Sequence, residues 1–218
     1  MNPLPIDPIL LKQMYYWGIF ISCLFLYVSY AGSNNCNKLL QKNSAIPAVV
    51  FTLFLIVYMG LRPISVQFGD TINYAAGYYR AAGSDTIVVD MDAEWLFYGI
   101  MNLCKISGLS VSAWFLIVEV CYLGFVLLAF KKLIGENPWM GMLFFLSAFS
   151  TFTYGTNGIR NGMACSVATF AFALGANKNI VKMVVPGIIV VLALGIHKST
   201  LLPTAEGSPN ESQCLQIG

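Results

Sequence analysis

One arginine, Arg160, lies in the stretch YGTNGIRNGMA, between two strongly apolar segments. A guanidinium presents a bidentate fork suited to phosphate, and the amino end of a helix adds free N–H groups and a favourable dipole. The neighbouring glycines would let a ligand approach the backbone closely. We therefore predict an anion-binding site here, with Asn157 and Asn161 in the same substrate-binding set. The alternative is an arginine that extends to the lipid headgroups.

A second group of polar side chains lies in LRPISVQFGDTINYAAGYYR. Pro63 should end the preceding helix at Arg62, which would leave the arginine's charge at the surface. Asp70 is placed to cap a short helix over residues 71–81. Tyr74 and Tyr78 are four residues apart and share a face of that helix. Such a face suits sugar rings, and it equally suits anchoring at a membrane interface.

Two ionisable groups lie elsewhere. Glu119 is near the centre of an apolar run, where a carboxylate is costly unless it is protonated or paired. It is either functional or a structural hydrogen bond to a neighbouring helix. His197, the only histidine, could transfer a proton at neutral pH, and Lys198 and Ser199 beside it could hold an oxyanion. The alternative for His197 is a residue at the membrane interface.

The chain that must position these groups is 57% hydrophobic and only 10% charged, which indicates a protein solvated mostly by lipid. Its twelve Lys and Arg are scattered singly or in pairs, so nucleic acid is not an expected partner. The six cysteines form no CxxC pair and are interpreted as small core residues. DMD at residues 90–92 resembles a metal-binding DxD, but capping of the stretch 93–105 explains it better. Neither a metal nor a cofactor is predicted.

Six apolar stretches reach or approach the roughly 17 to 25 residues that a helix needs to cross a bilayer. They are residues 15–32, 46–61, 109–130, 139–154, 159–176 and 181–196. The predicted fold is all-α: one polytopic transmembrane helix bundle over residues 1–200, with about six spans and short amphipathic helices in a long second loop. Residues 201–218 are polar and without periodicity, so we predict a disordered or aberrant tail.

Lysines set the predicted orientation, because short cytoplasmic loops accumulate Lys and Arg. Those in the first, third and fifth loops are Lys38, Lys42, Lys131, Lys132, Lys178 and Lys182. The amino terminus and the long second loop would then lie outside the cell. The two arginines, Asp70 and His197 would lie on that same outer side, although they are far apart in the sequence.

Three fragments together resemble the EpsG family of polysaccharide-biosynthesis membrane proteins, which is related to the Wzy-type O-antigen and capsule polymerases. The fragments are LRPISVQFGDTINY after the second span, GIRNGMA at the start of the fifth and IHKS at the end of the sixth. The resemblance runs over most of residues 15–200. Family members typically have ten or more spans, so this chain looks like an amino-terminal half.

The resemblance implies a membrane glycosyltransferase that joins oligosaccharide repeat units carried on undecaprenyl pyrophosphate, in capsule, exopolysaccharide or O-antigen synthesis. It would work at the outer face of the bacterial cytoplasmic (inner) membrane, with the lipid bilayer and other polysaccharide-assembly membrane proteins as partners. By position, Arg62 and Arg160 would hold pyrophosphate, and Asp70 or His197 would take the acceptor's proton. The substrate-binding set is completed by Tyr74, Tyr78, Asn157, Asn161 and Lys198.

Two other functions stay open. A flippase or transporter for lipid-linked sugars would also use outward arginines and aromatic faces, although it would place charged residues along a path through the membrane, where only Glu119 qualifies. An inactive, truncated fragment of the polymerase is the other alternative, and the polar tail suggests it.

Overall fold

The computed structural model describes residues 3–31, 45–80, 94–135, 137–176 and 183–200. Within these ranges every regular element is helical, so the all-α prediction is confirmed for them. The α-helices are α1 (Pro8–Ala31), α3 (Ala45–Gly60), α4 (Thr71–Arg80), α5 (Trp95–Ile106), α6 (Val111–Ile134), α7 (Pro138–Ser147), α8 (Phe149–Thr156), α9 (Ile159–Gly175) and α10 (Val184–Ile196). Short 3-10 helices cover Val66–Phe68 and Lys198–Thr200. The two short helices predicted in the second loop are α4 and α5.

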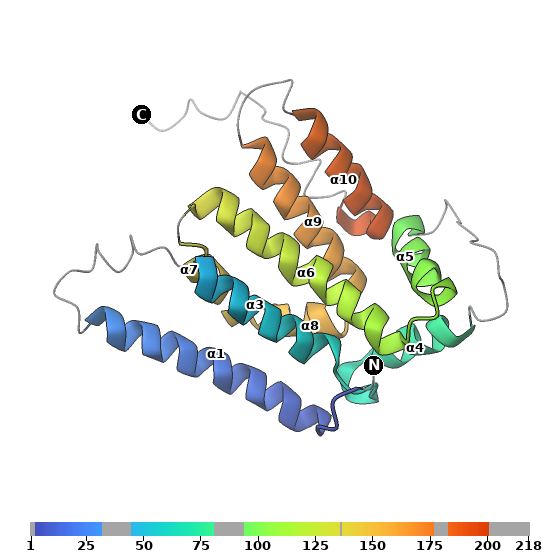
Figure 1. Cartoon of the computed structure of the whole chain (residues 1–218), viewed down its shortest axis with the longest axis horizontal. Helices are drawn as coiled ribbons and strands as arrows, with labels where there is room; N and C mark the ends of the chain where they lie inside the picture. Colours follow the sequence, from blue (N-terminus) through green and yellow to red (C-terminus); the bar gives the residue numbers. More distant parts are fainter. Residues whose placement is uncertain (1–2, 32–44, 81–93, 136, 177–182, 201–218) are drawn as a thin grey trace, which may run out of the picture.

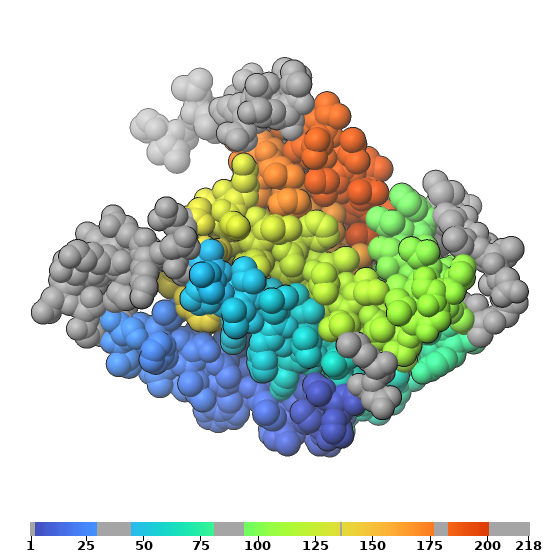
Figure 2. All heavy atoms as spheres, viewed as in Figure 1, coloured from blue at the N-terminus to red at the C-terminus, as the bar shows by residue number. Residues whose placement is uncertain are grey.

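Helix α6 lies at the centre of the bundle, against α3 on one side and α9 on the other (Figure 1). Its fully buried side chains include Trp114, Phe115 and Leu123. One apolar cluster joins α6 to α4, α5, α9 and α10, and a second joins it to α1, α3, α7 and α8. Figure 2 shows α1, α3 and α6 side by side on one face of the molecule. Close packing of this kind is what holds helices together in lipid.

The lengths of the helices bear on how the chain meets a membrane. In the part of the chain that is described, α1 over Pro8–Ser29 and α6 over Val111–Ile134 are long and apolar enough to cross a bilayer. Helices α3, α7 and α10 are apolar but shorter. The described residues of the six predicted stretches are mostly helical, and the number of crossings stays a prediction.

The fourth predicted span is not one continuous helix. Ala148 has extended backbone angles, φ −67° and ψ 128°, and separates α7 from α8. The break leaves carbonyl groups at the end of α7 that lipid cannot satisfy, and Ser147 Oγ and Thr151 Oγ1 donate to those of Phe144 and Phe145 at 2.7 and 2.6 Å. Tyr15 Oη of α1 donates to the Leu146 carbonyl at 2.8 Å, and Tyr122 Oη of α6 donates to the Thr151 carbonyl at 3.1 Å. Local and tertiary hydrogen bonds therefore both stabilise the break, although residue 148 is neither proline nor glycine.

The candidate residues gather at one end of the bundle. The carboxyl ends of α3, α8 and α10 lie there with the amino ends of α6 and α9, and α4 and α5 pack beside them (Figure 1). Lys131 and Lys132, in the last turn of α6, lie toward the other end. The other four lysines used for the orientation, the DMD motif and the tail 201–218 lie outside the described residues. The orientation across the membrane therefore stays a prediction.

Candidate functional site

A carboxylate that precedes α5 joins an arginine and a histidine from two other segments. Glu94 Oε2 accepts a hydrogen bond from Arg160 Nη1 in the first turn of α9, and Glu94 Oε1 contacts His197 Nδ1 at the end of α10. The side chains are partly shielded, with 31% of Arg160, 26% of His197 and 12% of Glu94 exposed. We call Glu94, Arg160 and His197 the rim cluster. It combines a permanent cation with an imidazole on an accessible surface.

Tyr74 of α4 holds the guanidinium from the other side. Arg160 Nε donates to Tyr74 Oη at 3.2 Å, and Arg160 Cζ lies 5.5 Å from the centroid of the Tyr74 ring. Burial raises the pKa of the Tyr74 phenol, while the hydrogen bond from Arg160 acts in the opposite direction. Tyr74 therefore acts as a neutral acceptor that positions Arg160.

The contact between Glu94 and His197 depends on close packing of α5 against α10. Gly195, two residues before His197, lies against the Trp95 ring, next to Glu94. A Cβ atom at Gly195 would lie 2.6 Å from Trp95 Cε2, so a larger residue would force the helices apart. Figure 1 shows α5 beside the carboxyl end of α10. A glycine thus lets two helix ends bring their functional side chains together.

Asp70 lies beside the turn between α8 and α9. Its N–H donates to Asn157 Oδ1 at 2.7 Å, and Thr71 Oγ1 donates to the Thr156 carbonyl at 2.6 Å. Gly69 has φ +57°, and a Cβ atom there would lie 2.3 Å from Asn157 Oδ1. These hydrogen bonds hold the segment of Asp70 against the segment of Asn157. The amide oxygen of Asn157 is used in this structural contact.

Asp70 has an exposed side chain and directly precedes helix α4. Its carbonyl accepts from the N–H of Tyr74, and its Oδ1 accepts from Asn73 Nδ2 at 3.1 Å. These bonds place Asp70 at the amino end of the helix predicted over residues 71–81, which ends at Arg80 in the structure. Asp70 therefore lies directly before the helix, while capping by its side chain and a catalytic role stay predictions.

Asn161 joins α9 to the segment after α10. Its Oδ1 accepts from Ser199 Oγ at 3.2 Å and faces Cys165 Sγ at 3.4 Å. Lys198, the remaining member of the predicted substrate-binding set, is exposed next to His197. Both residues border the rim cluster.

Arg62 differs from the prediction, because its charge does not lie at the surface. The residue is 1% exposed, and Nη1 donates to Glu119 Oε1 at 3.1 Å and to the Met59 carbonyl at 2.8 Å. The guanidinium also lies 4.5 Å from the centroid of the Phe115 ring. After α3 the side chain of Arg62 therefore points into the bundle. There it neutralises the carboxylate of Glu119, which would be costly to bury unpaired in α6.

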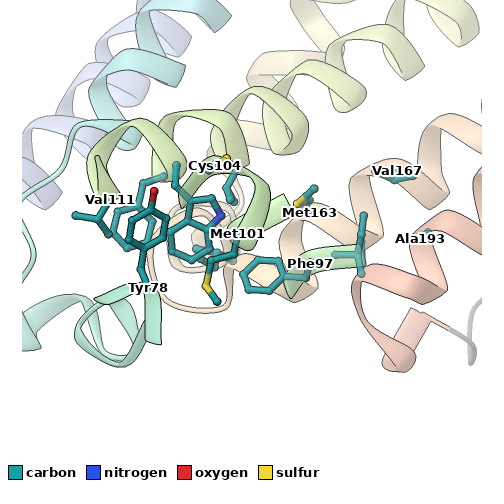
Figure 3. Close-up of a cluster of buried hydrophobic side chains, with 14 of the residues drawn as sticks. Tyr78, Phe97, Met101, Cys104, Val111, Met163, Val167 and Ala193 are labelled. Carbon is teal, nitrogen blue, oxygen red and sulfur yellow. The ribbon is translucent and has the colours of Figure 1, made fainter. Parts of the chain in front are cut away.

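Tyr78 is also inside the core. It is 3% exposed, its hydroxyl donates to the Leu109 carbonyl at 2.7 Å and its ring stacks on Trp114. Figure 3 shows Tyr78 in the same apolar cluster as Phe97 and Met101. Its ring is therefore not available to line a sugar groove, and only Tyr74 of the pair borders the rim cluster.

Glu94 is the member of the rim cluster that sequence reasoning missed. It stands in a loop of mixed charges, where it looked like one more acid near the start of an amphipathic helix. The only available signal was an acidic residue directly before that helix. An acidic residue before a helix does not indicate that its partners are Arg160 and His197, which lie 66 and 103 positions away in the sequence.

A scan of known protein families matches residues 45–203 to the EpsG family, which is more than half of the 218-residue chain. The chain belongs to the EpsG family. It is therefore a polysaccharide-biosynthesis membrane protein, and the resemblance carried by the three sequence fragments is confirmed. Every residue of the rim cluster lies inside the part that matches EpsG. The comparisons with curated proteins and with solved structures give no match.

Proposed function

We propose that this EpsG-family chain is a membrane glycosyltransferase that joins lipid-linked oligosaccharide repeat units, and that the rim cluster is its reaction site. The observation that carries the proposal is the carboxylate of Glu94, which holds Arg160 and His197 together. A cation and an imidazole side by side are what a transfer from a diphosphate donor requires. One meets the charge of the leaving group, and the other receives a proton.

The rim cluster would serve the reaction as follows. An acceptor hydroxyl attacks the anomeric carbon of the donor sugar, and the bond from that carbon to the lipid pyrophosphate breaks. Arg160 stabilises the negative charge that develops on the departing pyrophosphate, because its planar fork matches phosphate oxygens. Tyr74 keeps the guanidinium in place. Arg62 is not part of this step, since its guanidinium is buried against Glu119.

Undecaprenyl pyrophosphate at the outer face of the cytoplasmic membrane is the carrier we propose, in line with the predicted orientation. A sugar chain would then lie over the exposed side chains of Asp70, Asn73 and Lys198. The buried pairing of Glu119 argues against the flippase alternative, because Glu119 was its one candidate for a charged path through the membrane.

The test is a cell-free assay in which the full chain, reconstituted in liposomes, receives lipid-linked repeat units without a membrane potential. A polymerase lengthens the glycan, whereas a flippase only moves it between leaflets. Arg160→Lys keeps the charge but loses the fork, so we expect lengthening to slow by about 10- to 100-fold. Arg80→Lys, the same exchange at an exposed arginine of α4, is the matched control and should leave lengthening unchanged. Normal polymer from Arg160→Lys would contradict the role of Arg160.

A further inference from the structure

We propose that Glu94 is a positioning residue that holds His197 in the tautomer with the proton on Nδ1, so that Nε2 is the proton acceptor of the site. The use made of that proton rests on the proposed function, whereas the tautomer follows from the contacts of the resting protein. The sequence leaves Asp70 and His197 as alternative proton acceptors, and the contacts described below favour His197.

The contact between Glu94 and His197 identifies the nitrogen that carries the proton. A carboxylate only accepts hydrogen bonds, so the imidazole nitrogen that meets Glu94 Oε1 has to be a donor. In a neutral imidazole one nitrogen donates and the other accepts, which leaves a lone pair on Nε2. Arg160 engages the other oxygen, Oε2, and so keeps the carboxylate turned toward the ring.

The backbone of His197 is held as firmly as its ring. Its N–H donates to the Ala193 carbonyl at 3.1 Å, and its own carbonyl accepts from Thr200 Oγ1 at 2.8 Å. The packing of Gly195 against Trp95 keeps the two helix ends in contact. Glu94 therefore orients the imidazole, and the backbone bonds and helix packing fix the position from which the ring extends, as a base needs before substrate arrives.

Asp70 lacks such an arrangement. Its carboxylate is exposed, and its Oδ1 accepts from Asn73 within the same helix turn. Among the described residues no cation contacts this carboxylate, and Tyr74 links Arg160 to the backbone carbonyl of Asp70 rather than to its carboxylate. We therefore assign the acceptor's proton to His197. The hydroxyl proton passes to Nε2 as the oxygen bonds to the anomeric carbon, and the electron pair of the broken bond leaves with the pyrophosphate.

The single histidine allows a direct test. The full chain, labelled with ¹⁵N-histidine and purified in detergent micelles, gives the resonances of one ring, and their shifts tell a protonated nitrogen from one with a lone pair. At a pH where the ring is neutral we expect Nδ1 protonated and Nε2 bare. Glu94→Gln replaces an acceptor with an amide that can donate to Nδ1, so the tautomer with Nε2 protonated should increase. Asp70→Asn removes an equal charge at the same end of the bundle and should leave the spectrum unchanged.

A wild-type ring with Nε2 protonated, or with both nitrogens protonated from pH 7 to 8, overturns the proposal. Retention of the Nδ1 proton in Glu94→Gln overturns it as well. Because Glu94→Gln also loosens Arg160, a second variant, Arg160→Gln, keeps the Glu94–His197 contact and should keep the wild-type tautomer.

The rate of glycan lengthening in the same liposome assay is a second, independent test of the role of Glu94. Glu94→Gln should lower kcat by about 100-fold or more, because it removes the lone pair from Nε2 and also loosens Arg160; the loss beyond that of Arg160→Gln is the part due to the tautomer. A purely structural role would instead lower the amount of folded protein and leave kcat per folded molecule unchanged. If the wild-type chain shows the Nδ1 tautomer but lengthens no glycan, the proposed function fails and the positioning by Glu94 stands.

Discussion

Arg62 and Arg160 each pair with a glutamate, yet the two pairs lie in opposite environments. The Arg62–Glu119 pair has no exposed side-chain surface, whereas Arg160–Glu94 is partly open to solvent. A buried pair cannot exchange its partner for a ligand without opening the core, and an accessible pair can. The same residue types therefore serve two purposes: one pair holds helices together, and the other is available for chemistry.

The buried pair also leaves several polar atoms without a partner. Among the described residues, Arg62 Nε and Nη2 and Glu119 Oε2 have no hydrogen-bond partner. Such a pair is costly to build, and breaking it by removal of one partner costs even more. The predictions that follow probe this contrast, beginning with the largest expected effect.

Glu119→Ala should destabilise the protein by about 3–5 kcal/mol, because it leaves the Arg62 guanidinium buried without a countercharge. Thermal unfolding in detergent measures the loss. The double variant Arg62→Met/Glu119→Leu removes both charges and should recover much of it. Glu94→Ala is the matched change in the accessible pair, with an expected cost of about 1 kcal/mol or less. Equal losses for Glu119→Ala and Glu94→Ala would show that the contrast between the pairs is wrong.

Gly195→Ala should cost about 1–3 kcal/mol, because the new methyl group overlaps the Trp95 ring. It should also separate Glu94 from His197 and so reduce glycan lengthening in the liposome assay. Gly187→Ala, in the same helix, is the control, since a Cβ atom there meets nothing within 4 Å. That variant should be neutral or slightly more stable. Unchanged lengthening by a folded Gly195→Ala would remove the packing requirement for the rim cluster.

Tyr78→Phe and Tyr74→Phe compare a tyrosine of the apolar core with a tyrosine that contacts Arg160 of the rim cluster. Tyr78→Phe leaves the Leu109 carbonyl without its donor, so we expect a loss of about 1–2 kcal/mol with normal lengthening. Tyr74→Phe should cost about 1 kcal/mol or less but slow lengthening, because Arg160 Nε loses its acceptor. Unfolding and turnover of both variants are the measurements. Slower lengthening by Tyr78→Phe with normal lengthening by Tyr74→Phe would show that Tyr78, and not Tyr74, serves the site.

Added salt should give the smallest effect. The stability difference between wild type and Glu94→Ala should shrink by a few tenths of a kcal/mol, about 0.3, when NaCl rises from about 0.05 to about 0.5 M. The difference between wild type and Glu119→Ala should not change, because mobile ions do not reach that pair. Thermal unfolding at the two salt concentrations checks this. Equal screening of both differences would indicate that water reaches Glu119.

Much of the fold follows from local sequence patterns. Apolar runs coincide with helices α1, α3, α6, α9 and α10, and Asp70 correctly marks the start of α4. The break at Ala148 was not predicted, because serine and threonine also occur inside continuous apolar helices and neither proline nor glycine stands there. Ser147 and Thr151 donate to carbonyls at the end of α7, and a third bond comes from Tyr15 on the distant helix α1.

The site divides in the same way. The sequence by itself determined a helical membrane protein of the EpsG family with Arg160 at a helix start and His197 at a helix end, because hydropathy and helix-end chemistry act over a few neighbouring residues. Only the tertiary structure decided that Arg62 is buried against Glu119 and that Glu94 joins Arg160 to His197. The partner of a charge depends on which helix ends meet in space, and that outcome is set by packing among segments far apart in the chain.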